Sequence, residues 1–210
     1  MLSTKRHEMS IQMRQIALLV FIILLSNTSL LALVKIQEQV LNYKVLVNEE
    51  PKGNLVAKIS RDSDKDFKIS LVTTLDVFFL KIVSDISLEY ANGKLKQAKS
   101  SKHINGVRTE YTEMNQSNGK MVVKGSEIED LSISYPVTFS VGRLYHFEPS
   151  GFNKIFSERL GSEVSINNIG RNSYELRQPD GTRNYFFYRQ GVCFEMQTRM
   201  RGKKVRFVLQ

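Results

Sequence analysis

Two side chains with the chemistry for acid–base catalysis or metal binding, His146 and Glu148, lie two positions apart. On an extended chain they would share one face, because side chains alternate between the two faces of a strand. No serine, cysteine or aspartate pattern nearby completes a catalytic triad, and the chain has no HExxH spacing. A packed or surface histidine is therefore the better interpretation of His146. An enzyme that uses Tyr145, His146 and Glu148 is the least favoured of the three functional hypotheses considered below.

The chain has one cysteine, Cys193, and three histidines. A single cysteine excludes an internal disulfide framework and a cysteine-ligated zinc site, and three histidines leave little material for a metal centre. Cys193 is interpreted as a small packed thiol; the alternative is a thiol whose pKa is lowered by neighbouring lysines and arginines. There is also no glycine-rich phosphate loop. We therefore expect neither a metal nor a cofactor.

A candidate binding segment is the aromatic-rich stretch YPVTFSVGRLYHFEPSG at residues 135–151, the longest stretch without an alternating pattern. Long irregular segments in compact domains are often lids or binding loops. We predict a flap over the mouth of a curled sheet that contacts an apolar ligand. The alternative is that its rings plug one end of a barrel. The candidate ligand-binding residues are Tyr135, Phe139, Tyr145, His146, Phe147 and Phe152.

The last hairpin is a second candidate surface, because residues 171–210 hold nine basic and three acidic residues. One face is predicted to be apolar and core-facing, with Phe194, Met196, Phe207 and Leu209. The other would form an anion-facing patch for anionic lipid, an acidic envelope polymer or an acidic partner. The alternative is a solvated face that protects an edge strand. No nucleic-acid-binding motif is present. The patch residues are Arg199, Arg201, Lys203, Lys204 and Arg206.

The N-terminus has the pattern of a targeting segment. A basic start precedes ten apolar residues at 16–25, and small residues follow up to Ala32. This pattern predicts a cleaved signal peptide over residues 1–32. The alternative is a membrane-anchoring helix over residues 16–36, which is long enough to cross a bilayer. In either case the remaining chain is expected outside the cytoplasm, either periplasmic or secreted.

The elements that must position these residues are strands. With 41% hydrophobic and 24% charged residues the chain is typical of a globular protein. Apolar residues recur with the two-residue period of half-buried strands, and Asn105-Gly106 and Asn118-Gly119 are strong hairpin signals. The nearly continuous apolar run at residues 77–83 is interpreted as one strand buried on both faces. We predict a single all-β domain over residues 33–210, an antiparallel meander of about ten strands curled into an open or closed barrel.

Three features together resemble a known family. They are the signal peptide, a first strand with a polar-Pro-x-Gly turn over residues 45–53, and the closing stretch YFFYRQGVCFEMQTRMRGKKVRFVL at 185–209. The sequence from about residue 40 to residue 209 resembles DUF6134, a family of secreted bacterial β-rich domains of unknown function near the DUF3108 type. The resemblance implies export and a curled antiparallel sheet, and it brings no active residues.

The favoured hypothesis for function is an exported, non-enzymatic, barrel-like protein that binds an apolar or lipid-like ligand behind the aromatic flap. The alternative is a structural or envelope-surface protein that contacts anionic lipid or polymer through its basic C-terminal hairpin.

Overall fold

The computed structural model describes residues 37–210, except residues 78 and 127. The predicted signal peptide, residues 1–32, and the alternative anchor to residue 36 lie outside the described residues. The described strands are β1 (Gln37–Val47), β2 (Glu50–Arg61), β3 (Phe67–Val77), β4 (Leu80–Ala91), β5 (Lys94–Ile104), β6 (Val107–Ser117), β7 (Lys120–Gly125), β8 (Ile128–Ile133), β9 (Lys154–Ser157), β10 (Ser162–Gly170), β11 (Ser173–Arg177), β12 (Arg183–Arg189), β13 (Val192–Met200) and β14 (Lys203–Leu209), with one 3-10 helix, η1 (Val141–Tyr145).

All these strands belong to one antiparallel sheet with the order β8-β7-β6-β5-β4-β3-β2-β1-β14-β13-β12-β11-β10-β9. Consecutive strands are neighbours except β8 and β9, and the first and last strands pair through Tyr43–Leu209 and Val47–Val205. This is the connectivity of an up-and-down barrel that is open between β8 and β9. The predicted all-β antiparallel meander is confirmed, with 14 strands in the described residues instead of about ten.

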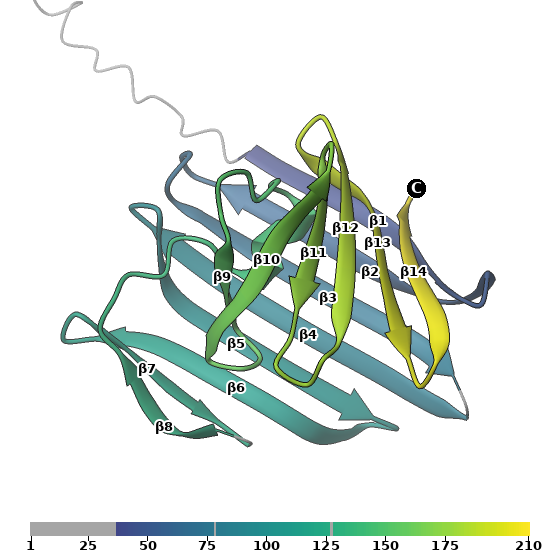
Figure 1. The fold of residues 1–210 in the computed structure, drawn as a ribbon. Helices are drawn as coiled ribbons and strands as arrows, with labels where there is room; N and C mark the ends of the chain where they lie inside the picture. The colour runs from purple at the N-terminus through teal and green to yellow at the C-terminus, as the bar shows by residue number, and fades with distance from the viewer. Residues whose placement is uncertain (1–36, 78, 127) are drawn as a thin grey trace, which may run out of the picture. The chain divides into compact units, whose positions relative to one another are not determined.

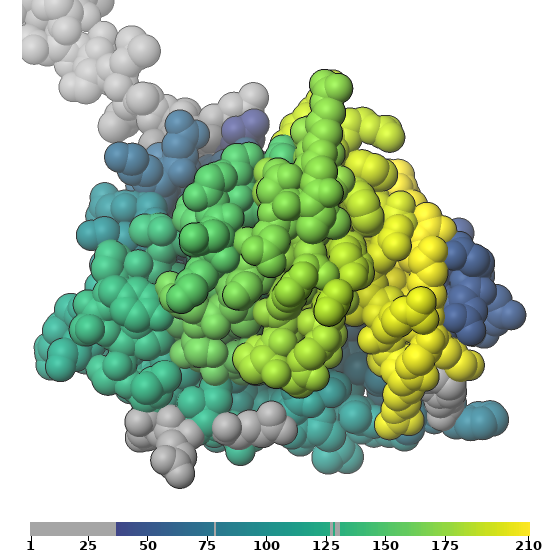
Figure 2. All heavy atoms as spheres, viewed as in Figure 1, coloured from purple at the N-terminus to yellow at the C-terminus, as the bar shows by residue number. Residues whose placement is uncertain are grey.

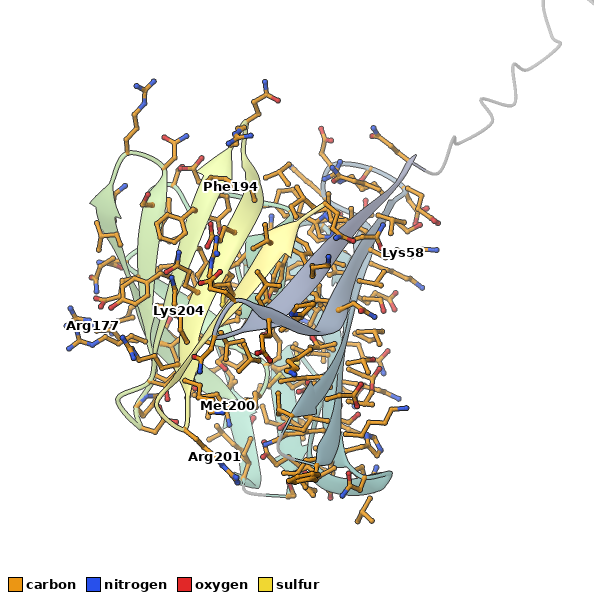
Figure 3. The ribbon with its side chains drawn as sticks, turned by 90° about the vertical axis from the view of Figure 1, so that its right-hand side faces the viewer. Lys58, Arg177, Phe194, Met200, Arg201 and Lys204 are labelled. Carbon is orange, nitrogen blue, oxygen red and sulfur yellow. The ribbon has the colours of Figure 1, made fainter. Side chains whose placement is uncertain are left out.

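The sheet curls so that two layers face each other. Strands β1 to β6 form the layer behind and β9 to β13 the layer in front, with β14 beside β1 (Figure 1). Viewed from the side, the two layers enclose the side chains of the core (Figure 3). In β1 the buried Tyr43 and Val45 alternate with the exposed Asn42 and Lys44, as the period of two requires. Other fully buried side chains are Leu55, Ile59, Leu88, Leu95, Met114, Ile155, Ile166 and Leu176.

The apolar run at residues 77–83 is not the continuous strand that the sequence predicted. Val77 at the end of β3 pairs with Leu80 at the start of β4, so the run contains a hairpin turn. Phe79 lies in this turn with a φ of 65°, a conformation that is uncommon for an aromatic residue. The prediction failed because the turn contains no glycine, proline or asparagine to mark it.

A bulge in β13 corrects a second prediction. Cys193 pairs with Tyr188 and Glu195 pairs with Phe187, which leaves Phe194 as an extra residue. Its ring lies 6.4 Å from the ring of Phe187, on the face opposite to the buried Cys193. The predicted core-facing position of Phe194 is therefore wrong. The other apolar members of the row are buried or packed against the core as predicted: Met196, Phe207 and Leu209.

Candidate functional site

The chain between β8 and β9 runs into the space between the two layers, and we call residues 137–146 the interior segment. Its backbone is fixed on both sides: the Leu95 amide donates to the Val137 carbonyl (2.8 Å), and the Phe156 amide donates to the Phe139 carbonyl (3.1 Å). Leu144 is 0% exposed. The segment therefore fills the interior at the place where β8 and β9 do not pair with each other.

The six side chains predicted to bind a ligand do not share one environment. Three are buried: Phe139, Tyr145 and His146. Three are half-buried or exposed: Tyr135, Phe147 and Phe152. The structure brings the rings of Phe139 and Phe152 within 4.7 Å of each other. The ring of Tyr145 instead packs 5.3 Å from that of Tyr43, deep in the core. Their role in ligand binding stays a prediction.

Arg143, at the centre of the interior segment, is enclosed by aromatic rings. Its guanidinium carbon lies between 4.6 and 5.1 Å from four ring centroids, those of Phe67, Tyr90, Phe139 and Phe147. Each contact is a cation–π interaction, which is stronger when the cation is partly removed from water. The guanidinium also donates to the Thr138 carbonyl. Burial lowers the pKa of Arg143, and the neighbouring Tyr90 opposes this effect.

A buried carboxyl group contacts the backbone of the residue that precedes this arginine. Glu158 is 1% exposed, and its Oε1 accepts a hydrogen bond from the Gly142 amide at 3.0 Å. Ser140 also bonds Glu158 and accepts a 2.8 Å hydrogen bond from the Tyr90 hydroxyl. Burial raises the pKa of Glu158 above its ordinary value. A Cβ atom at Gly142 would lie 2.7 Å from Leu88 Cδ1 and 3.1 Å from Glu158 Oε1, so any larger residue would require these side chains to shift.

His146 and Glu148 contact different partners. The Nδ1 atom of His146 lies 3.4 Å from Gln39 Oε1, whereas Glu148 accepts a 2.9 Å hydrogen bond from the Tyr174 hydroxyl. Burial, with a smaller effect from the charge of Arg61, lowers the pKa of His146 to about 4. The imidazole is therefore neutral at pH 7. In the described residues no group of three His, Cys, Asp or Glu side chains is placed to hold a metal ion.

Cys193 is a packed thiol in the core. It is 0% exposed, and its Sγ donates to the Glu195 carbonyl at 3.3 Å. The Tyr43 hydroxyl donates to the Cys193 carbonyl at 2.6 Å. Burial raises the pKa of the Cys193 thiol to about 12, so the reactive thiolate is scarce at neutral pH.

The five basic residues predicted as one patch divide between several places. Arg199 and Lys204 pair across β13 and β14 and line a groove on the outer face of the layer. Lys203 lines a different groove at the end of the sheet. Arg201 is exposed in the hairpin turn, with a φ of 49°. Arg206 is held by Glu195 and Glu49, each at 2.6 Å.

A groove of about 600 Å³ opens where four hairpin turns meet, and we call it the mouth groove. The turns are β1–β2, β3–β4, β5–β6 and β13–β14, which gather at one end of the sheet (Figure 1). Its lining residues are Val47, Asn48, Glu50, Lys52, Asp76, Val77, Phe79, Leu80, Lys81, Asn105 and Lys203. Val47 and Val77 are buried and supply an apolar floor.

Two asparagines fix the turns around the mouth groove in the same way. The backbone amide of Asn48 donates to the Lys204 carbonyl (2.9 Å), and the backbone amide of Lys204 donates to the side-chain Oδ1 of Asn48 (3.1 Å). Asn105 makes the same reciprocal pair with Lys81, at 2.8 Å in both directions. Both asparagines have positive φ, near 50°, which asparagine tolerates better than most residues. Neighbouring hairpins are thereby tied together at their tips.

Of the residues that line the mouth groove, only Lys203 was predicted as a site residue, and Phe79 is the most exposed of those that were missed. Its side chain is 106% exposed, the highest value among the exposed large hydrophobic residues described. A fully exposed aromatic ring with positive φ gains no burial energy on folding and has an uncommon backbone conformation. The only signal in the sequence is the apolar run at residues 77–83, which is too long to be one more strand between the neighbouring hairpins. Such local conflicts occur mainly at functional sites.

The rim of the mouth groove is cationic. Lys52, Lys81 and Lys203 outnumber Glu50 and Asp76. Lys52 pairs with Glu50 at 2.9 Å, and both side chains are well exposed. The arrangement can hold an apolar group on the floor and an anionic group at the rim.

The curled antiparallel sheet with a filled interior defines an all-β, barrel-like domain. The family model for a domain of unknown function, DUF6134, matches residues 43–210, and the chain belongs to that family. This confirms the family predicted from the sequence. No curated protein matches the chain. One similar solved structure is a beta-barrel-like protein of the domain of unknown function DUF1849 from Brucella abortus, with 12% identity, a TM-score of 0.48, and coverage of 83% of this chain and 96% of that chain.

Proposed function

We propose that the mouth groove binds an amphiphile, a molecule with an apolar chain and an anionic head group. The observation that carries the proposal is the fully exposed ring of Phe79 at a groove with an apolar floor and a lysine-rich rim. Contact with an apolar chain would remove this ring from water, at a gain of about 25 cal/mol for each Å² covered. Lys52 and Lys81 would face the head group.

The filled interior supports a ligand at the mouth rather than between the layers. The apolar core is continuous and includes the interior segment, with Leu144 and Ile166 both 0% exposed. Interiors packed in this way have few voids larger than a water molecule. The apolar or lipid-like ligand expected from the sequence would therefore occupy the open groove. Export to the periplasm or beyond fits such a ligand and rests on the leader pattern of residues 1–32.

A tryptophan at position 79 tests the proposal, because the natural chain contains no tryptophan. Full-length Phe79→Trp protein would be titrated with decanoate below its micelle concentration, and with acetate as the head group alone. We expect the emission of the introduced indole to shift to shorter wavelength with decanoate, in a saturable way, because the ring leaves water. Acetate should cause no shift.

The matched control is Ile169→Trp, which places the reporter on another exposed apolar residue, 50% exposed and outside the mouth groove. Its emission should not respond to decanoate. An equal response at both positions would mean non-specific adsorption, and no response at position 79 would mean that the groove does not bind amphiphiles. Either result overturns the proposal.

A further inference from the structure

A second groove, of about 570 Å³, lies on the outer face of the β9–β14 layer, and we call it the outer groove. Figure 2 views the molecule from this face, with the green β11–β12 turn on one side of the groove and the yellow β13–β14 hairpin on the other. Its lining residues are Asp180, Gly181, Thr182, Arg183, Tyr185, Gln197, Thr198, Arg199 and Lys204. None of them is aliphatic, in contrast to the mouth groove.

The register of the strands explains why these side chains meet. Glu175, Tyr185, Gln197 and Arg206 are cross-strand neighbours in one row over β11 to β14. Arg199 and Lys204 are paired in the adjacent row, two residues further along each strand. Tyr185 and Gln197 thus form the floor, and the cations rise beside them. The outward side chains of this layer point away from those of the other layer, as Arg177 and Lys58 show (Figure 3).

The cations that line the outer groove are held only weakly by the protein. Arg183 lies 3.5 Å from Glu175, and Lys204 lies 3.7 Å from Glu49. Arg199 donates only to a backbone carbonyl, that of Gly202, at 3.3 Å.

Neighbouring cations outside the groove differ, because they make short ion pairs with the same acids. Arg177 lies 2.5 Å from Glu175, and Arg206 lies 2.6 Å from both Glu49 and Glu195. The carboxylates are therefore satisfied by Arg177 and Arg206. Arg183, Arg199 and Lys204 make only the longer contacts, so they can bind another anion.

The remaining lining groups favour a sugar over a lipid head group or a free phosphate. Thr182 offers a hydroxyl group, and Gln197, whose amide nitrogen donates to Glu195 Oε1 at 2.8 Å, offers its amide oxygen to a sugar hydroxyl. The ring of Tyr185 offers a flat apolar face with a polar end, which suits the C–H face of a sugar ring. An arginine binds a carboxylate through two parallel hydrogen bonds.

From these contacts we propose that the outer groove binds an acidic saccharide, a sugar unit that carries a carboxylate, as part of an anionic polymer. Arg199 and Arg183 bind the carboxylate, Lys204 adds positive potential, and Tyr185 stacks on the sugar ring. This site is separate from the mouth groove and does not depend on the function proposed for it.

The test is calorimetric titration of the full-length chain with trigalacturonic acid, with its methyl ester and with inorganic phosphate. We expect saturable binding of the acid that weakens as salt is raised, and little binding of the uncharged ester. Arg199→Gln should weaken binding at least about tenfold, because a charge-assisted hydrogen-bond pair is lost. The matched control is Lys58→Gln, which removes one positive charge from the outer face of β2, where Lys58 pairs with Glu38 at 2.8 Å.

Each other outcome overturns the proposal. Equal loss of affinity in Lys58→Gln would mean attraction to net charge alone. Phosphate binding as tight as trigalacturonate binding would make the groove a simple anion site. Equal affinity for the methyl ester would remove the role of the arginines, and no binding at millimolar concentration would remove the site.

Discussion

The interior segment places charged and titratable side chains in the core, whereas the mouth groove places an aromatic side chain in water. Arg143, His146 and the neighbouring Glu158 are enclosed by the two layers, and Arg143 and Glu158 have partners within the chain. Phe79 is fully exposed in a turn of positive φ. The two regions therefore reverse the usual distribution of polar and apolar groups.

This contrast separates the unusual residues that serve the fold from those that are available to a ligand. Glu158, whose carboxyl group is hydrogen-bonded inside the protein, contributes to a unique core. An exposed aromatic ring makes little packing contact with the fold, so it is available to a ligand. Changes in the interior segment should lower stability and leave binding alone, whereas changes at Phe79 should weaken binding without lowering stability. The following predictions test that separation.

The largest effect is expected from Leu144→Ala in the interior segment. Removing a fully buried leucine side chain costs about 2–5 kcal/mol of the free energy of unfolding. Urea unfolding followed by circular dichroism measures it. Val72→Ala, on the outer face of β3 and 39% exposed, is the control and should cost about 0.5 kcal/mol. If the two variants lose the same stability, the interior segment is not part of the core.

The next effect concerns pH. Burial lowers the pKa of His146 from 6.5 to about 4, so between these values the unfolded chain binds a proton that the folded chain does not. Stability is therefore lost as the pH falls from 6.5 to 4, by roughly 3 kcal/mol from this group. The pKa of Glu158 is raised, so the contribution of this group to stability increases as the pH falls, in every variant that retains it.

His146→Gln isolates the histidine contribution. As the pH falls from 7 to 4.5, the natural chain should lose more unfolding free energy than the variant. Any stability advantage of the natural chain at pH 7 should therefore shrink or reverse. Decanoate affinity at pH 7 should be the same in both proteins. Parallel stability curves over this range would show that His146 is not buried as a neutral group.

At the mouth groove, Phe79→Asn should weaken decanoate binding about tenfold or more, because about 1.4 kcal/mol of ring burial corresponds to one factor of ten. Isothermal titration at pH 7 measures it. Ile169→Asn removes an exposed apolar side chain of similar character and should leave the affinity unchanged. Unchanged affinity in Phe79→Asn would break the comparison, because the exposed ring would then serve neither fold nor ligand.

Much of the fold could be predicted from local signals. Asn105-Gly106 and Asn118-Gly119 both form turns with positive φ at each residue, as expected for hairpins. The alternating residues of β1 are buried as their period of two predicts. What could not be predicted is non-local: β1 pairs with β14 across the whole length of the described chain, and no short-range pattern specifies that contact.

The sites were harder to predict than the fold, for two physical reasons. The enclosure of Arg143 requires rings from β3, β4 and the interior segment to converge, which only the tertiary structure brings about. Lys203 and Lys204 are adjacent in sequence, but alternation along β14 directs them to different grooves. The density of basic residues therefore pointed to the β13–β14 hairpin, but it could not show which groove each residue lines.

The smallest expected effect is on the stability of Phe79→Asn. It is a gain, whereas the same substitution is expected to weaken binding. Phe79→Asn should raise the free energy of unfolding by about 1 kcal/mol, since asparagine accepts positive φ more readily than phenylalanine. Urea unfolding at pH 7 measures the gain. The reverse exchange, Asn118→Phe, places a phenyl ring at a φ of 50° in the β6–β7 turn and should lower stability by a similar amount. If Phe79→Asn is instead less stable, the ring supports the fold, and its exposure is no longer an argument for a ligand.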